Sequence, residues 1–456
     1  MVFSADTLLD LLHDFPVGSR FAVAYSGGLD STVLLHAMHH ALSLAQARSA
    51  GAPVYSLRAI HVNHGLSVHA DQWQVLCEQT CAHLGVPLHV ERVRIDPDEG
   101  ASLESLAREK RYAVFERQLA EGECLLMAHH LDDQAETFLL RTLRGAGPRG
   151  LSAIPQQRPL GRGLVLRPLL ELPRDVLRDY AEREALAWVD DESNESLMFD
   201  RNFCRHSILP VLESRWPGYR ESWKRSAQLS AEADVLLDEL AAIDYAQVKS
   251  PMESVIDATA LAALGPARQR NVLRYWLSLT GAPDPGWNVL MHIVDDMIPA
   301  AAGSHPEIRW RNETTSVVVR RFRQHLYLKK QLDALDDITP IAWQPEQSLH
   351  LPGNGLIYAL AVKGEGLVVP DAAELNLRYR QGGESCRLHG RRTRSLKKIL
   401  QDAGIEPWLR DRIPLVYCAD ELVCVPGVGV VEGWKAASGA PGWRVVWVPP
   451  DISVSR

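Results

Sequence analysis

The chain has 456 residues, of which 46% are hydrophobic and 23% are charged, and its formal net charge is −8. This length is too great for one ordinary core and predicts about two or three domains. The composition is typical of a globular protein, and no apolar run is long enough to cross a bilayer, so we expect no membrane partner. Residues 1–20 lack the basic start and the small-residue cleavage site of a signal peptide, so we expect a cytoplasmic protein.

Residues 20–143 alternate between strand and helix patterns, which predicts an α/β fold with a parallel sheet. The expected strands are residues 21–25, 55–62, 87–93 and 124–128. The expected helices lie near residues 31–49, 71–84 and 102–120. Ligands of such sheets bind beyond the carboxyl ends of the strands. Polar loops follow three of these strands, so we expect the loops 26–28, 63–67 and 129–133 to converge on one edge of the sheet.

A glycine turn joins the first predicted strand to the first helix. Gly27 and Gly28 permit backbone angles that other residues avoid. Free N–H groups at the helix start, with the hydroxyls of nearby serines and Thr32, would hold an anion such as the pyrophosphate part of ATP. A P-loop is excluded, because its G-x-x-x-x-G-K-[ST] spacing and its lysine are absent. Asp30 would repel bound phosphates unless a cation lay between them, so we expect it to bind Mg²⁺.

The same turn resembles the S-G-G-x-D-S motif of the PP-loop ATP pyrophosphatases, which split ATP between its α and β phosphates and adenylate a carbonyl oxygen. The resemblance implies that ATP is bound by Ser26, Gly27, Gly28, Leu29, Asp30 and Ser31. The alternative is a glycine turn without a ligand. It does not explain why strand, turn and helix all lie where the motif requires them.

The loop after the fourth strand places acids and histidines side by side. On a helix that begins near Asp132, Glu136 lies one turn from both Asp132 and Asp133, so three carboxylates gather at the first turn. Such acids are often only partners of the helix dipole. His129 and His130 beside them favour a cluster that holds adenine, Mg²⁺ or a substrate ammonium group. The pattern H-H-x-D-D-x-x-E-T also resembles that of the tRNA-modifying branch of the PP-loop proteins, where it lines the nucleotide and substrate pocket.

Two basic segments lie near these loops in the sequence. Arg108 and Arg111 are neighbours on one face of the helix at 102–120, which is either solvated or, as in the A-R-x-x-R-Y stretch of the same branch, faces the active site. The glycine-rich loop 145–151 is basic and suits an RNA backbone. The arginines in and around it are Arg141, Arg144 and Arg149.

Residues 167–205 narrow the resemblance to the tRNA(Ile)-lysidine synthetase family. In that family a D-x-S-N segment and an R-N-x-x-R helix complete the catalytic domain, and the matching residues here are Asp191, Ser193, Asn194, Arg201, Asn202 and Arg205. The resemblance implies adenylation of the C2 oxygen of the wobble cytidine in a tRNA(Ile) with a CAU anticodon, release of pyrophosphate, and displacement of AMP by L-lysine. It implies catalytic roles for Asp30, Arg111, His129, Asp133, Glu136 and Arg205. It implies substrate binding by Arg108, Asp132, Asp133, Glu136 and Asn202.

After residue 210 the strand and helix alternation stops. Helical spacing at 217–245 and 261–299 predicts a helical domain, with expected core positions Trp223, Leu229, Leu236, Leu237 and Leu240. We expect a hairpin within residues 308–319 and a linker at 331–355. The expected domains are therefore a PP-loop catalytic domain at 1–215, a mainly helical tRNA-contacting domain at 216–335, and a basic α+β tRNA-binding domain at 345–456.

Residues 378–412 form a basic window in an acidic chain, with ten Lys and Arg against four Asp and Glu. Phosphate binding explains this better than a solvated helix with mixed charges. The segment R-S-L-K-K-I-L-Q followed by P-W-x-R is similar to the carboxyl-terminal domain of the longer lysidine synthetases, which grips the tRNA. The expected tRNA-binding residues are Arg387, Arg391, Arg392, Arg394, Lys397 and Lys398.

Two other functions would explain parts of the sequence. A PP-loop tRNA thiolase needs reactive cysteines, yet the chain has no C-x-x-C and no cysteine beside the motif loops. A non-catalytic RNA-binding protein would explain the basic window but not the intact ATP motif with its clustered acids. The oligomeric state is left open, with a homodimer as one possible assembly.

Overall fold

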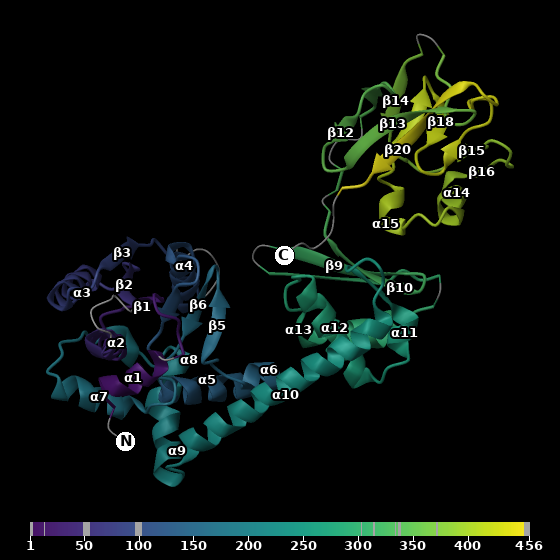
Figure 1. Cartoon of the computed structure of the whole chain (residues 1–456). Coiled ribbons are helices and arrows are strands. Elements are labelled where there is room, and N and C mark those ends of the chain that lie inside the picture. Colours follow the sequence, from purple (N-terminus) through teal and green to yellow (C-terminus); the bar gives the residue numbers. More distant parts are fainter. Residues whose placement is uncertain are drawn as a thin grey trace. The chain divides into compact units, whose positions relative to one another are not determined.

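The computed structural model describes residues 3–12, 14–48, 55–95, 103–301, 303–312, 315–332, 334–335, 339–370 and 373–450. The chain folds as two compact units, Met1–Leu236 and Leu237–Arg456, and Figure 1 labels many elements of each. Within the described residues, no helix has the length and apolar character needed to span a membrane.

A six-stranded sheet in the order β3-β2-β1-β4-β6-β5 forms the centre of the first unit (Figure 1). Its strands are β1 Arg20–Ala24, β2 Ser56–Asn63, β3 Leu88–Arg92, β4 Cys124–Leu126, β5 Gln157–Leu160 and β6 Gly163–Leu166. The pairs β1–β2, β2–β3, β1–β4 and β4–β6 are parallel, which confirms the predicted sheet and its four strands. The antiparallel hairpin β5–β6 was not predicted. Its strands are only four residues long, and Pro159 and Gly163 interrupt the pattern by which a strand is recognised.

Helices cover both faces of this sheet, because alternate strand residues point to opposite sides. Phe21 and Val23 of β1 pack with α1 Ala5–Leu12, α2 Leu29–Arg48, α3 Ala70–Leu84 and α7 Arg174–Arg183. Ala22 points the other way and packs with α4 Leu103–Gln118. With both faces covered, the ends of the strands are where a ligand can reach the sheet.

The remaining elements of the first unit are mostly short. They are α5 Leu131–Leu143, α6 Pro148–Leu151, η2 Glu192–Glu195, α8 Asp200–Phe203, η3 Cys204–Ile208 and α9 Leu209–Arg215. The long helix α10, Tyr219–Val248, begins in the first unit and ends in the second. Leu229 and Leu236 on this helix are 58% and 65% exposed, so their prediction as core positions was wrong. Helical spacing shows which face is apolar but not whether another element covers it.

In the second unit, α11 Ala258–Ala262, α12 Pro266–Leu279 and α13 Gly286–His292 pack with an antiparallel sheet around the fully buried Trp276. The sheet has the order β7-β10-β9-β8 and consists of β7 Val255–Asp257, β8 Glu307–Arg311, β9 Ser316–Phe322 and β10 His325–Lys330. The pairing of β8 with β9 confirms the predicted hairpin. The described residues from Ser316 to Lys330 show that this predicted helical domain also contains a sheet.

The carboxyl-terminal part of the second unit contains β-sheets and two short helices. The larger sheets have the orders β11-β14-β17-β18-β19 and β12-β13-β20. The strands not described below are β13 Gly355–Lys363, β14 Leu375–Arg378, β19 Gly429–Val430 and β20 Pro441–Val448. The predicted helix start at Ser395 is confirmed by α14 Leu396–Asp402, and the predicted hairpin by β17 Leu415–Cys418 with β18 Glu421–Val425. The predicted linker 331–355 was wrong in part, because it contains β11 Ile341–Trp343 and β12 Leu349–Leu351. β11 pairs with residues such as Asn376, which lie far along the chain, whereas β12 pairs with the strand that follows it, for example Leu349 with Ile357.

Candidate active site

The loops that follow β1 and β4 meet at the carboxyl edge of the parallel sheet. His130 Nε2, after β4, lies 3.7 Å from Asp30 Oδ2, in the first turn of α2. The end of β2 adjoins the same place, because His61 Nδ1 is 2.9 Å from the carbonyl oxygen of Tyr25. The fold therefore brings polar loops together at the edge where we expected them.

Serine hydroxyls brace the turn between β1 and α2. Ser31 Oγ donates to the carbonyl oxygen of Gly28 at 3.0 Å and lies 3.0 Å from Ser26 Oγ. The backbone N–H groups of Ser26 and Gly28 donate to the serine oxygens of Ser31 and Ser26 at 3.2 and 3.4 Å. These contacts shape the start of a 20-residue helix, whose N–H groups and dipole favour an anion.

Gly27 is required in this turn for two reasons. Its φ of +84° is a conformation that residues with side chains rarely adopt. A Cβ atom there would also lie 2.8 Å from Cys77 Sγ, on α3. The carbonyl oxygen of Gly27 accepts a hydrogen bond of 2.9 Å from the N–H of Val189, so the segment after α7 holds the turn from outside.

Asp30 lies between the side chains of Arg174 and His130. Arg174 Nε donates to Asp30 Oδ1 at 3.4 Å, and His130 contacts the other oxygen. Burial raises the pKa of Asp30, but the hydrogen bond and charge of His130 and the charge of Arg174 outweigh it, so the pKa lies below its ordinary value. The pKa of His130 is lowered by burial but raised more by Asp133 and Asp30, and lies above its ordinary value.

His130 also starts the helix that carries the acids. Its Nδ1 accepts from the N–H of Asp133 at 3.4 Å, and its own N–H donates to Asp133 Oδ2 at 3.0 Å, which makes a capping box. This arrangement confirms a helix start beside the acids. It places Asp133 toward His130 rather than toward solvent.

Each of the three predicted acids forms ion pairs with arginine side chains. Glu136, which is fully buried, accepts from Arg201 Nε and Arg205 Nε, each at 2.6 Å. Arg201 Nη2 also donates to Asp133 Oδ1 at 2.8 Å. Asp132 accepts from Arg220 Nε at 2.7 Å and from the backbone N–H of Arg174 at 2.9 Å. The acids are thus parts of an ion-pair network, and their assigned catalytic and substrate-binding roles stay predictions.

Sequence reasoning missed two members of this network, Arg174 and Arg220. Arg220 lies 88 residues after Asp132, on α10, and no local pattern connects them. Arg174 follows Pro173 at the start of α7, where a basic residue is unfavourable to the helix dipole. That unfavourable position is the one signal that could have drawn attention to it.

The other predicted catalytic-domain residues differ in their surroundings. Asn202 is buried and donates from Nδ2 to the carbonyl oxygen of Ser196 at 3.0 Å, so at least one of its amide groups supports a loop. Arg111 is half-buried, and its charge lowers the pKa of His64.

His129 and Arg108 line a cavity beside the acids. Burial lowers the pKa of His129 to about 3, so this ring is neutral at pH 7.

Metal ligands do not gather in this site. Among the described residues, no group of three or more His, Cys, Asp or Glu side chains is arranged to hold a metal ion. Asp30 lies 3.4 Å from Arg174 Nε and 3.7 Å from His130 Nε2, and both distances are longer than a close charge-assisted hydrogen bond. Mg²⁺ commonly uses one or two carboxylates, several waters and substrate phosphates, so Asp30 fits a metal shared with ATP but not a complete protein cage.

The predicted tRNA-binding residues are all exposed, in a segment that includes β16 Arg394–Ser395 and α14. Arg394 and Lys398 share Asp402, at 2.7 and 3.2 Å, and Arg387 lies 3.8 Å from Glu432. Such exposed pairs are weak and can be exchanged for phosphates. Binding of tRNA at this window stays a prediction.

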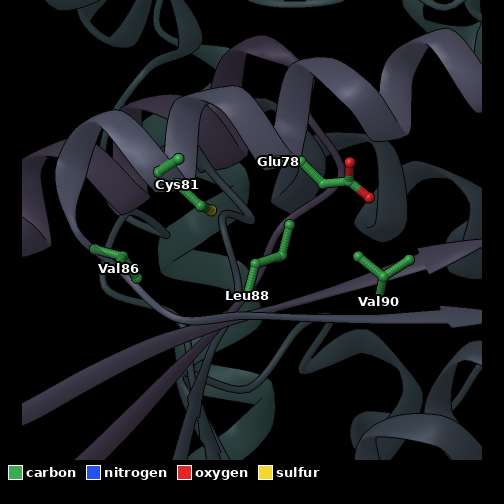
Figure 2. Close-up of a pocket in the computed structure, with 6 residues that line it drawn as sticks. Glu78, Cys81, Val86, Leu88 and Val90 are labelled. Atoms are coloured by element: carbon green, nitrogen blue, oxygen red, sulfur yellow. The ribbon is translucent and has the colours of Figure 1, made fainter.

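A second cavity, of about 360 Å³, lies between α3 and β3. Figure 2 shows Glu78 and Cys81 on the helix above Leu88 and Val90 of the strand. Burial raises the pKa of the Cys81 thiol to about 11, so it is neutral and unreactive at pH 7. This cavity brings no reacting groups together.

Comparison with known proteins agrees with the geometry. Residues 4–212 match the family model of the PP-loop domain, residues 256–327 the TilS substrate binding domain, and residues 375–447 the TilS substrate C-terminal domain.

Full-length relatives cover nearly the whole chain. The tRNA(Ile)-lysidine synthase of Coxiella burnetii is 42% identical over 452 residues, 98% of each chain. That of Pseudomonas aeruginosa is 42% identical over 97% of this chain and 96% of the relative, and that of Alkalilimnicola ehrlichii 40% over the same shares. The resemblance seen in residues 26–31 and 167–205 is confirmed, and the chain belongs to the tRNA(Ile)-lysidine synthase family.

Proposed function

We propose that this ligase uses ATP to join L-lysine to C2 of the wobble cytidine in a tRNA(Ile) with a CAU anticodon. The observation that carries the proposal is the contact between Asp30 and His130, which joins the ATP motif to the acid and arginine network. The cytidine O2 bonds to the α phosphorus of ATP and pyrophosphate leaves. The lysine ε-amine then bonds to C2 and loses a proton, and AMP departs with the former O2.

The turn at residues 26–31 holds the phosphates of ATP. The braced hydroxyls of Ser26 and Ser31 and the first N–H groups of α2 are polar groups that suit an anion. Asp30 would share Mg²⁺ with these phosphates, and the metal would offset their negative charge. Arg174 and His130 keep Asp30 ionised and oriented for that purpose.

The arginine network stabilises charge that develops near the cytidine. Glu136 fixes Arg205 through Nε and Nη2, at 2.6 and 3.1 Å, and the Arg205 side chain remains 25% exposed. An oriented guanidinium at a partly dry site stabilises negative charge on a phosphate without reorganising. Asp133 and Glu136 act in this proposal by positioning arginines, and the lysine ammonium group approaches the exposed part of the network.

A thiolase remains a poorer explanation. Six of the seven cysteines are buried, and the seventh, Cys418, is half-buried. Burial raises the pKa of Cys77 and Cys124 to about 12, the opposite of what a sulfur carrier needs. We place the enzyme in the cytoplasm, where its tRNA is found, and a homodimer stays a prediction.

The test uses Asp30→Ala with Asp175→Ala, an exposed acid on α7, as a matched control. Asp30→Ala should abolish pyrophosphate release from ATP in the presence of tRNA and lysine, while tRNA affinity stays close to that of the wild type. Mass spectrometry of the tRNA should show added lysine with the wild type and Asp175→Ala. Normal turnover by Asp30→Ala would remove the case for a Mg²⁺ contact there, and added sulfur would support the thiolase.

A further inference from the structure

Six arginines line a cavity of about 590 Å³ beside the active-site acids. They are Arg108, Arg141, Arg149, Arg158, Arg167 and Arg201. We call this space the arginine-lined cavity. It is large enough for a small organic ligand. Its lining residues come from α4, α5, β5 and the loops around α6.

The arginines of this cavity differ in whether a carboxylate or a carbonyl oxygen of the protein already binds their guanidinium groups. Arg201 is paired with Glu136 and Asp133, and Arg149 with Asp234 at 3.1 Å. Arg141 Nη1 donates to the carbonyl oxygens of Gly150 and Ala153, at 2.6 and 2.8 Å, and so holds the glycine-rich loop. Arg108, Arg158 and Arg167 form no ion pair with a carboxylate of the described residues. These three are the cations available to a ligand.

Tyr112 holds two of these cations in place. The guanidinium carbon of Arg108 lies 5.0 Å from the ring centroid, and that of Arg158 lies 4.9 Å from it. Stacking on an aromatic ring orients a guanidinium without cancelling its charge. Arg108 comes from α4 and Arg158 from the β5–β6 hairpin, so this strand pair supplies a wall of the cavity.

Arg167 supplies a third, deeply placed cation. It is 3% exposed, its Nη1 donates to the carbonyl oxygen of Pro155 at 2.5 Å, and its buried Nε has no hydrogen-bond partner in the described part of the chain. Burial lowers the pKa of Arg167. Tyr112 opposes this shift, and the charges of Arg158 and Arg108 add to it. A buried donor without a partner is costly, so an anionic ligand would stabilise this group.

The lining distinguishes an RNA phosphate from the other substrates. Residues 26–31 of the ATP turn are not part of it, and none of the described lining residues is a carboxylate that would select lysine or Mg²⁺. His129 and Thr137 add polar groups among the arginines. We propose that the arginine-lined cavity binds the phosphodiester groups on either side of the reacting cytidine, an inference that rests on the proposed function.

The test compares Arg158→Ala with Arg162→Ala, a control from the turn of the same hairpin that is exposed and not part of the lining. The probes are cytidine 3′,5′-bisphosphate and an unmodified tRNA(Ile) transcript, with the full-length chain. Arg158→Ala should weaken bisphosphate binding by roughly tenfold and reduce the salt slope of tRNA binding by roughly 0.7 to 0.9. Arg162→Ala should match the wild type, and ATP affinity without tRNA should be unchanged in both.

Equal bisphosphate affinity in the two variants would overturn the inference, and so would loss of ATP binding in Arg158→Ala, because the cavity would then hold the triphosphate. If Arg158→Ala does not fold, Arg108→Ala, whose guanidinium also lies over the Tyr112 ring, replaces it, with the same supporting and overturning results. Lysine transfer by the wild type is measured separately. Absence of lysine transfer would refute the proposed function. The comparison of bisphosphate affinities tests only the proposed role of the cavity.

Discussion

Glu136 is fully buried, and it is stabilised in the core because Arg201 and Arg205 each donate to it at 2.6 Å. Helical spacing was enough to predict that Glu136 lies near Asp132 and Asp133. It could not predict the arginines, which lie 65 and 69 residues away in the sequence. A buried carboxylate must find a cation, but the sequence does not say which one.

Replacing Glu136 with Gln should therefore affect both stability and activity. Breaking a buried ion pair from one side costs about 3 kcal/mol, and Arg205 would lose the carboxylate that holds its guanidinium in place. We expect a lower free energy of unfolding and weaker adenylation or lysine use, measured by denaturant unfolding and steady-state kinetics. Glu182→Gln on the exposed face of α7 is the control. If the kinetics and stability of Glu136→Gln equal those of this control, the acids are only partners of the helix dipole.

The pKa of His64 depends on the nearby charge of Arg111. Burial lowers the pKa of His64 to about 4, and the charge of Arg111 contributes. Arg111→Ala should raise this pKa, as followed by NMR titration of the imidazole, whereas Arg117→Ala at the exposed end of α4 should not. Because the folded pKa lies below the unfolded value of about 6.5, unfolding takes up protons as the pH falls from 6.5 towards 4. His64 therefore reduces stability in that window. An unchanged His64 pKa in Arg111→Ala would show that the two groups do not interact.

At the scale of elements, the turn from β1 to α2 depends on backbone conformation and on its neighbour α3. The sequence predicted the need for glycine from the motif. The approach of Cys77 Sγ to within 2.8 Å of a Cβ at residue 27 appeared only when α3 was packed on the sheet. The β5–β6 hairpin is a similar case, because its short strands are stabilised by pairing with β4 rather than by their own pattern.

Gly27→Ala should destabilise the protein more than Gly85→Ala. Both positions have positive φ, of 84° and 67°, but a Cβ at Gly85 meets nothing within 4 Å. Gly85→Ala should therefore cost about 1 to 2 kcal/mol, the backbone strain alone, and Gly27→Ala should cost more and weaken ATP binding. In a Cys77→Ala background the cost of Gly27→Ala should approach that of Gly85→Ala. An undiminished difference, measured by chemical denaturation, would show that the sulfur is not the cause.

At the scale of the whole molecule, charge is divided unevenly. The basic window at residues 378–412 lies in a chain of net charge −8, and its arginines at 391, 392 and 394 are exposed. The sequence predicted this window without knowledge of the fold. Arginine side chains are usually exposed, and the clustering of basic residues can be read from the sequence itself.

A triple change of Arg391, Arg392 and Arg394 to Ala should lower the salt slope of tRNA binding by about 2 to 3 if all three contact phosphates. ATP affinity should not change, and activity at low tRNA concentration should fall and partly recover at high concentration. The matched triple is Lys363, Lys435 and Arg444 to Ala, which are also exposed in this part of the chain. Equal effects of the two triples would indicate a general charge effect, and a wild-type slope in the first would show a solvated surface.

The sequence by itself determined the parallel sheet, the ATP turn, the family and the basic window. Each depends on short-range information, namely the φ requirement of Gly27, the period of strands and helices, and the spacing of residues in motifs. The tertiary structure decided which arginines hold Glu136, that Leu229 on α10 is exposed, and that Arg158 joins Arg108 around Tyr112. These outcomes depend on which buried charges and faces meet after the chain has folded, because a buried group is stabilised by neighbours in space and not by neighbours in sequence.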